Sequence, residues 1–285
     1  MVSSSPLGEY LRARRASLRP EDVGLVSMGQ RRVEGLRRDE VAQLSGVSED
    51  YYLRIEQGRD RQPSDQVLFA LARALKLDFT AVQYMKRLVS MQSGGPDLRE
   101  PRQVSDAVDK VLRSLLTQWA STPAYILDRN HTVLMANRLA SSLFPGVEQG
   151  TNLPILVFSD EWRVVDTQWE ETARAMVAAL RFSSDPDDTA LRQIVGVLTM
   201  RHPDFTRLWA LHEARPSYIS TARLSLAGFG TVEFTKQSLL VPGGRGHVLT
   251  VFQAEEGSAA ADVIRVTRMQ LAEALPAPVR EVVSA

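Results

Sequence analysis

The stretch Val41-Ala42-Gln43-Leu44-Ser45-Gly46-Val47-Ser48 decides the fold of the N-terminal part of the chain. Ala42 is the small residue that two helices need where they cross closely, and Gly46 tolerates the positive φ of a tight turn. Val47 supplies an apolar plug after the turn, and Ser48 is a preferred helix N-cap. This spacing predicts a helix-turn-helix whose second helix enters the major groove of DNA. The alternative is an ordinary pair of helices in an all-α domain.

The sequence around this motif predicts a domain of five short helices over residues 7–90. Apolar residues recur at helical spacing, and serine or glycine stands at the expected helix ends. The expected helices start near Leu7, cover Arg38–Leu44 and Glu49–Gln57, follow the Ser64 cap, and cover about Thr80–Val89. Ser93-Gly94-Gly95-Pro96 then has the composition of a linker.

The pattern changes after Pro123, where short β-prone runs appear between helical segments. A further helix is expected between Val104 and Trp119. The expected strands are Ala124–Leu127, Thr132–Ala136, Tyr218–Leu226, Thr231–Val241 and Gly246–Ala254. The expected helices are Asn137–Leu143, Glu161–Phe182, Pro186–Met200, Pro203–Ala214 and Ser258–Leu271. The chain is therefore divided into a helix-turn-helix domain (7–92), a mixed α/β domain with an antiparallel sheet (98–271) and a mobile tail (272–285).

Composition agrees with a globular protein of about two domains, since the chain has 285 residues, 44% hydrophobic and 24% charged. The 34 basic and 34 acidic residues cancel, but they are distributed unevenly. Residues 1–95 hold 15 Lys or Arg against 12 Asp or Glu, and residues 10–38 hold 8 against 3. A locally basic end favours a polyanionic partner.

Several classes of protein are disfavoured by what the sequence lacks. The chain has no cysteine, which excludes disulfides and thiol catalysis and favours a reducing compartment. No apolar run reaches the ~18 residues of a membrane span, and no secretory signal is visible. The four histidines lack metal-ligand spacing, and neither a P-loop nor a G-x-S-x-G elbow occurs. We therefore expect a cytoplasmic protein that is not an enzyme and carries no metal or cofactor.

The candidate DNA contacts lie on the second motif helix and around it. Arg54 is expected to bond guanine O6 and N7, and Glu49 or Asp50 to accept from cytosine N4. Arginines on either side of the motif are expected to contact phosphates and to offset the repulsion by those two acids. The full candidate set is Arg31, Arg32, Arg37, Arg38, Ser48, Glu49, Asp50, Tyr51, Arg54, Arg59, Arg61 and Ser64. For each arginine the alternative is a solvated surface charge.

The residues up to about 90 resemble the Xre/Cro-type helix-turn-helix. More narrowly, Gly35-Leu36-Arg37-Arg38-Asp39-Glu40-Val41-Ala42, Tyr51-Tyr52 and Ile55-Glu56-Gln57-Gly58-Arg59 resemble the MmyB-like transcription regulators. The resemblance continues through Asn137-Arg138-Leu139-Ala140 and Phe205-Thr206-Arg207-Leu208-Trp209, and it covers most of residues 7–270. It implies a PAS-like ligand-binding domain, a small apolar or acyl-like effector, and an ion pair between Glu56 and Arg15. The chain departs from the family at Leu226–Gly230, where relatives often carry a His-Pro pair.

The candidate effector contacts are taken from aromatic and polar residues of the second half. They are Asn137, Trp169, Arg181, Phe205, Trp209 and His212. An aromatic-rich α/β domain can hold an apolar pocket with a few polar anchors, but each aromatic residue can equally be ordinary core.

The function expected is that of a homodimeric regulator of double-stranded DNA whose operator affinity changes with the effector. One helix-turn-helix module makes few contacts, so a dimer on two half-sites about one turn (~34 Å) apart is expected. The alternative keeps the DNA-binding domain but makes the C-terminal domain a ligand-free dimerisation or protein-interaction module. A DNA-tethered enzyme would require a cluster of titratable groups that the sequence does not indicate.

Overall fold

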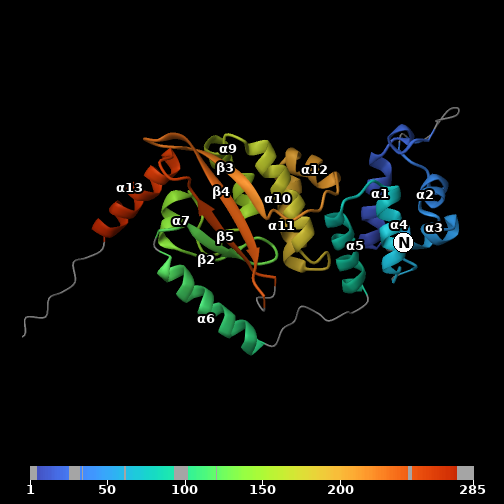
Figure 1. Ribbon diagram of the computed structural model, residues 1–285, viewed down its shortest axis with the longest axis horizontal. Helices are drawn as coiled ribbons and strands as arrows, with labels where there is room; N and C mark the ends of the chain where they lie inside the picture. The colour runs from blue at the N-terminus through green and yellow to red at the C-terminus, as the bar shows by residue number, and fades with distance from the viewer. Residues whose placement is uncertain are drawn as a thin grey trace, which may run out of the picture. The chain divides into compact units, whose positions relative to one another are not determined.

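The computed structural model describes residues 5–25, 33, 35–60, 62–92, 102–119, 121–242 and 246–274 (Figure 1). The chain forms two compact units. The first contains residues 1–99 and 174–216, and the second contains residues 100–173 and 217–285. Three helices from the second half of the chain therefore belong to the same unit as the N-terminal helices, which the sequence did not predict. The expected linker at Ser93–Pro96 lies outside the described residues.

The N-terminal part of the first unit has the five α-helices expected, with one 3₁₀ turn added. They are α1 (Pro6–Ser17), η1 (Pro20–Val23), α2 (Arg38–Ser45), α3 (Glu49–Glu56), α4 (Asp65–Ala74) and α5 (Phe79–Gln92). Gly46 ends α2 with φ of 73°, the left-handed conformation that the motif requires. The Ser48 and Ser64 side chains cap α3 and α4 by accepting backbone N–H groups. The helix-turn-helix prediction is confirmed.

The first helix, α1, crosses α3 so closely that the crossing leaves no room for a side chain at Gly8. Leu7 and Leu11 of α1 are fully buried together with Tyr52 and Ile55 of α3. A Cβ placed on Gly8 would lie 2.1 Å from the carbonyl oxygen of Glu56, so only glycine allows this crossing. The position of α3 is therefore set by α1 as well as by the motif turn.

The first unit also contains most of α10 (Trp169–Ser183) with α11 (Thr189–Arg201) and α12 (Pro203–Ala210). The expected helix Glu161–Phe182 was wrong, because Asp166 is extended and separates α9 (Asp160–Val165) from α10. The Asp188 side chain caps α11, so that helix starts at Thr189. His212 takes a left-handed conformation with φ of 49°, so the helix expected to reach Ala214 ends earlier.

The second unit is built on a five-stranded antiparallel sheet, as predicted (Figure 1). Its strands run in the order β2-β1-β5-β4-β3, which brings the two ends of the domain together as β1 beside β5. The strands are β1 (Ala124–Leu127), β2 (Val133–Ala136), β3 (Ile219–Leu226), β4 (Gly230–Leu240) and β5 (Val248–Gln253). With its flanking helices, this sheet confirms the expected PAS-like, mixed α/β class.

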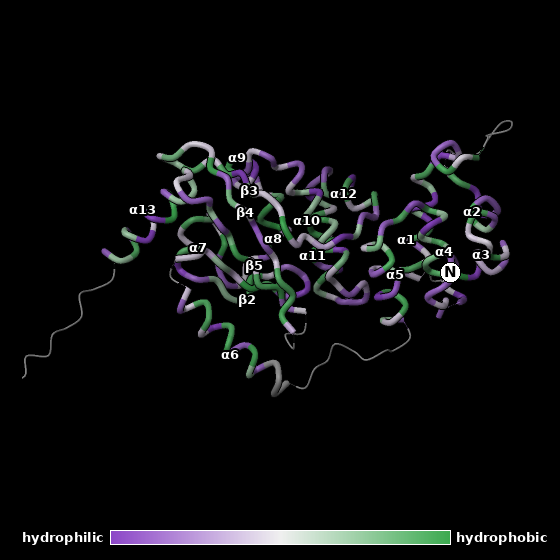
Figure 2. Tube along the Cα trace, viewed as in Figure 1, coloured by the Kyte–Doolittle hydropathy of each residue, from purple (hydrophilic) through white to green (hydrophobic). Residues whose placement is uncertain are grey.

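Each face of this sheet carries its own packing layer. The helix α6 (Arg102–Gln118) buries Leu112 and Leu116 against Ile126 and Val251, and purple and green alternate along it in Figure 2. Rings of Phe144, Phe234 and Phe252 pack together, the last two from neighbouring strands. The remaining helices are α7 (Arg138–Leu143), α8 (Leu153–Val157), which was not predicted, and α13 (Ala259–Glu273).

The last helix corrects the start of the expected tail. Because α13 continues to Glu273, residues 272 and 273 are helical, and Ala272 and Glu273 are both good helix formers. Residues 275–285, which make up the rest of that tail, lie outside the described part of the chain.

Candidate functional site

The outward surface of α3 carries the polar groups expected to contact bases. Glu49, Asp50 and Arg54 are exposed, and Tyr51 is half-buried beside them. The Arg54 guanidinium lies 3.6 Å from the Asp50 carboxylate and 5.5 Å from the centre of the Tyr51 ring. The same helix buries Tyr52, Ile55 and Glu56 on its other face. The arrangement offers one hydrogen-bond donor group and two carboxylate acceptors to a major groove.

The two helix-capping serines lie on the exposed surface as well. The Ser48 Oγ accepts from the backbone N–H of Tyr51 at 3.2 Å, and the Ser64 Oγ accepts from that of Val67 at 3.4 Å. A hydroxyl that accepts in this way still has its own hydrogen to donate. Both serines therefore retain a donor suited to a phosphate oxygen.

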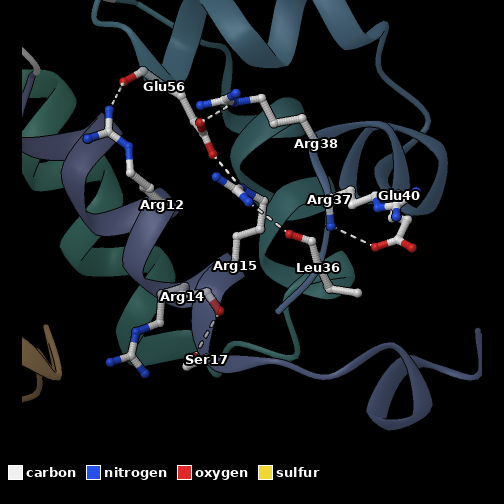
Figure 3. Close-up of polar contacts among 9 residues, drawn as sticks. All are labelled: Arg12, Arg14, Arg15, Ser17, Leu36, Arg37, Arg38, Glu40 and Glu56. Carbon is white, nitrogen blue, oxygen red and sulfur yellow. Dashed lines mark hydrogen bonds and ion pairs between the residues drawn. The ribbon is translucent and has the colours of Figure 1, made fainter. Parts of the chain in front are cut away.

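A buried carboxylate at the end of α3 joins three separate segments of the domain (Figure 3). The Glu56 side chain is 0% exposed, and its two oxygens accept from Arg15 Nε and Arg38 Nε, each at 2.7 Å. Burial alone would raise the pKa of Glu56, but the hydrogen bonds from both arginines outweigh it and hold that pKa below its ordinary value. Arg15 also donates to the carbonyl oxygen of Leu36. The expected pair between Glu56 and Arg15 is confirmed.

The arginines proposed for phosphate contact differ in what they bind within the chain. The Nε of Arg38 donates to Glu56, which gives this residue a structural role. Its side chain is nevertheless 43% exposed, so the rest of the guanidinium can also reach a phosphate. Arg37 and Arg59 are exposed, and the Arg37 backbone N–H donates to Glu40 Oε2 at 2.6 Å (Figure 3). Arg31, Arg32 and Arg61 lie outside the described residues.

Three of the candidate effector contacts form a cluster in the first unit. The Arg181 Nη2 donates to the carbonyl oxygen of Trp209 at 2.6 Å, and its Cζ lies 3.7 Å from the centre of the Trp209 ring. The buried ring of Phe205 stacks on Trp209, with centroids 5.6 Å apart. Burial lowers the pKa of Arg181. Its Nε is buried and donates no hydrogen bond within the described part of the chain.

His212 lies near this cluster in the first unit. Burial, followed by the charges of Arg181 and Arg14, lowers its pKa to about 4. The imidazole is therefore neutral at physiological pH and can both donate and accept a hydrogen bond.

Asn137 and Trp169 belong to the second unit and have separate neighbours. The Asn137 Oδ1 accepts from the backbone N–H groups of Ala124 and Ala140, and its Nδ2 donates to the carbonyls of Trp119 and Thr122. All its hydrogen-bonding positions are filled, so we correct Asn137 from an effector contact to a structural residue.

Trp169 is held through its indole N–H, which donates to the Val157 carbonyl at 2.6 Å. Its ring meets Phe158 edge-on at 5.6 Å and lies 3.5 Å from the Arg163 guanidinium carbon. Within the second unit, Trp169 therefore has its own aromatic and cationic neighbours.

A further group on the sheet was missed by the sequence analysis. Lys236 lies opposite Phe252 in the strand register and shares its face of β4 with the buried Val232 and Phe234. Burial lowers the pKa of Lys236, and the Asp166 carboxylate opposes that shift. Burial and the Lys236 charge lower the pKa of His131 to about 4. The period-two pattern of residues 232, 234 and 236 would have revealed a lysine among apolar neighbours.

The described residues contain neither a cluster of metal ligands nor a membrane-spanning helix. Within those ranges, no three His, Asp or Glu side chains converge as ligands for a metal ion. No helix there combines the length and the apolarity that crossing a membrane requires.

Comparison with known protein families matched both halves of the chain. Residues 6–83 match the family model described as a helix-turn-helix domain. Residues 108–266 match the model described as the MmyB-like transcription regulator ligand binding domain. No curated protein matches the chain. Both matched families are regulatory or ligand-binding domains.

Proposed function

The chain belongs to the family of transcription regulators with an MmyB-like ligand binding domain, and we propose that it binds a specific operator with an affinity set by a small effector. The observation that carries the DNA half of this proposal is the polar surface of α3. Arg54, Glu49 and Asp50 are exposed there. On the buried face of the same helix, Glu56 fixes α3 through its ion pair with Arg15 of α1. A recognition helix requires both a free polar face and a fixed orientation.

In this proposal the base contacts are made by α3 and the phosphate contacts by its surroundings. Arg54 bonds guanine, and Glu49 or Asp50 accepts from cytosine. Tyr51 supports Arg54 through the ring contact described above. The phosphates are contacted by Arg31, Arg32, Arg37, Arg38, Arg59 and Arg61 and by the hydroxyls of Ser48 and Ser64.

We further propose that the protein acts as a homodimer in the cytoplasm, with residues 7–92 as the DNA-binding domain and residues 98–271 as the sensing and dimerisation domain. A single motif makes too few contacts for specific binding at physiological salt, whereas two half-sites about 34 Å apart supply enough. It acts by binding and not by catalysis.

The effector proposed is a small apolar or acyl-like molecule. Support comes from the buried Nε of Arg181, a donor without an acceptor in the described chain, beside the stacked rings of Trp209 and Phe205. His212 and Trp169 are proposed as further contacts. The alternative is that the C-terminal domain binds no small molecule and serves dimerisation or protein interaction alone.

The DNA half is tested by fluorescence anisotropy with labelled duplexes carrying random sequence, at several salt concentrations. Six to ten phosphate contacts would lower the affinity about 10³- to 10⁵-fold between 50 and 200 mM salt. The variant Arg265→Ala removes an arginine that is ion-paired with Asp262 on the surface of α13. It should bind with the same salt dependence as the wild type. Affinity that is independent of salt would contradict the proposal.

The effector half is tested by native mass spectrometry of the purified protein, with a denaturing run of the same sample. A dimer carrying a non-covalent adduct of a few hundred daltons supports the sensing proposal and supplies the mass of the effector. A clean dimer favours the interaction-module alternative. A clean monomer contradicts the model with paired half-sites.

A further inference from the structure

The boundary of the matched ligand-binding domain and the boundary of the first compact unit do not coincide. Residues 108–266 match the ligand-binding family, yet residues 174–216 within that range are compact with the N-terminal helices. We call Arg174–Pro216 the docking segment. It comprises the end of α10 with α11, α12 and the residues up to Pro216.

The first contact of the docking segment is a guanidinium placed at the end of a helix. Arg87 of α5 donates to the backbone carbonyls of Phe182, Ser183 and Ser184, where α10 ends. The last carbonyls of a helix have no partner within the helix and carry its partial negative charge. An arginine at this position satisfies several of them at once, so α5 supplies the C-terminal cap of α10.

Aromatic rings next to this cap continue the contact into the core of the DNA-binding domain. Phe182 stacks on Tyr84 of α5 with centroids 6.0 Å apart, and Tyr84 meets Tyr10 of α1 edge-on at 5.0 Å. Ala214 is buried within the same apolar core. The docking segment thus shares the core on which α1 and α5 depend.

A second polar contact reaches α1 itself. Arg14 donates to the carbonyl oxygen of Leu211 at 2.5 Å, while the neighbouring Arg15 donates to Glu56 at the end of α3. Two adjacent residues of one helix therefore bind the docking segment and the recognition helix, respectively. A displacement of α1 caused by the docking segment would therefore also displace the recognition helix α3.

We propose that the docking segment regulates the DNA-binding domain by holding α1 and α5 through Arg87, Phe182 and Arg14, so that its release changes the setting of α3. The docking itself is independent of the function proposed above, whereas its regulatory consequence rests on that function. The helix α10 also carries Trp169 at its other end, so one helix connects a proposed effector contact with the docking contacts.

The docking is tested by hydrogen exchange of the full chain without DNA or effector. Arg87→Ala should speed amide exchange about tenfold or more in α1, α5 and the docking segment, and leave β1 and β5 unchanged. Lys86→Ala is the matched control, because Lys86 pairs with Asp65 of α4 and stays within the N-terminal helices. Phe182→Leu, which keeps an apolar side chain, is the second variant in case Arg87→Ala fails to fold. Exchange at wild-type rates in the folded variants would overturn the docking.

The regulatory part is tested with the same variants on one labelled duplex that the wild type binds. Coupling of the usual size predicts a change of about 5- to 150-fold in affinity for Arg87→Ala or Phe182→Leu. Lys86→Ala should remain within about twofold. Faster exchange with unchanged affinity would overturn the regulatory role, and a wild type that binds no duplex would instead contradict the proposed function.

Discussion

The helix-turn-helix motif and the docking segment are both made of short helices, but their contacts operate over different distances along the chain. In the motif, Gly46 ends one helix and Ser48 begins the next within a few residues. In the docking segment, Arg87 bonds carbonyls about 95 residues away, and Arg14 bonds Leu211 over 197 residues. The first region can therefore be recognised from local spacing, whereas the second exists only through tertiary contacts. Variants of His212 and of the helix caps test whether the two regions nevertheless fold as one unit, whereas variants of Glu56 and Gly196 test each region by itself.

The largest effect is expected at Glu56. Glu56→Ala removes the carboxylate that pairs with Arg15. The Arg15 side chain is only 12% exposed, so its charge would stay buried without a counter-ion. Breaking a buried pair by removing one partner costs about 3–5 kcal/mol. Urea unfolding followed by circular dichroism measures the loss. Asp50→Ala, which removes an exposed partner of Arg54, is the control and should cost less than about 1 kcal/mol. Similar costs for the two variants would show that Glu56 is not an anchor.

The second effect is a dependence of stability on pH that originates in the docking segment. The folded pKa of His212 is about 4, below its ordinary value of 6.5, so the unfolded chain binds the proton more readily between those values. The contribution of a neutral His212 is complete above pH 6.5 and is lost as the pH falls towards 4, by about 1–3 kcal/mol once solvent screening of this partly exposed side chain is included.

His212→Asn keeps a residue that tolerates positive φ and should flatten this part of the curve of unfolding free energy against pH. His131→Asn is the matched variant, because His131 also has positive φ and a pKa of about 4 but lies in the second unit. If His212→Asn changes the pH dependence only of a transition in which the N-terminal helices stay folded, the docking segment does not fold with those helices.

A third pair of variants compares equivalent helix caps in the two regions. Ser48 caps α3 in the motif, and Asp188 caps α11 in the docking segment. Replacing either cap by alanine should cost about 0.5–2 kcal/mol. If the first unit unfolds cooperatively, Ser48→Ala and Asp188→Ala should both lower the midpoint of the same thermal unfolding transition. Two separate transitions, each sensitive to one variant, would contradict that cooperativity.

The smallest expected effect is a gain in stability. Gly196 lies inside α11, and a Cβ added there meets no atom within 4 Å. Gly196→Ala should therefore stabilise the first unit by about 0.5–1 kcal/mol through the cost that glycine imposes on a helix. Differential scanning calorimetry would detect the shift, and a decrease in the midpoint would show that the site is packed more tightly than described.

Sequence reasoning succeeded where a rule acts within a few residues. It predicted the Gly46 turn, the Ser48 and Ser64 caps, and every end of the five strands to within two residues. It failed at Asp166, which it placed inside one long helix. Asp166 is extended and bridges Leu224, and a contact with so distant a residue leaves no local signal. The same limit explains Gly8, whose importance comes from the carbonyl of Glu56 and not from its neighbours in α1.

The candidate site residues divide along the same line. Arg54 and Glu49 were placed correctly on the exposed face of α3, because helical periodicity assigns faces. The contact of Arg181 with Trp209 and the four hydrogen bonds of Asn137 to backbone groups depend on chain crossings that periodicity does not contain. Composition showed an excess of aromatic residues in the second half, but not which of them share a core.

The central claim is that α3 reads a DNA sequence through Arg54. The most direct measurement is selection of binding duplexes from a random pool by the full chain, repeated with Arg54→Ala and with the control Arg265→Ala. The account predicts two half-sites with centres about one helical turn apart. It also predicts that Arg54→Ala relaxes preference at one guanine by about 1–3 kcal/mol and that Arg265→Ala leaves the site unchanged. A pool without enriched sequence, or an identical site for Arg54→Ala, would contradict the claim.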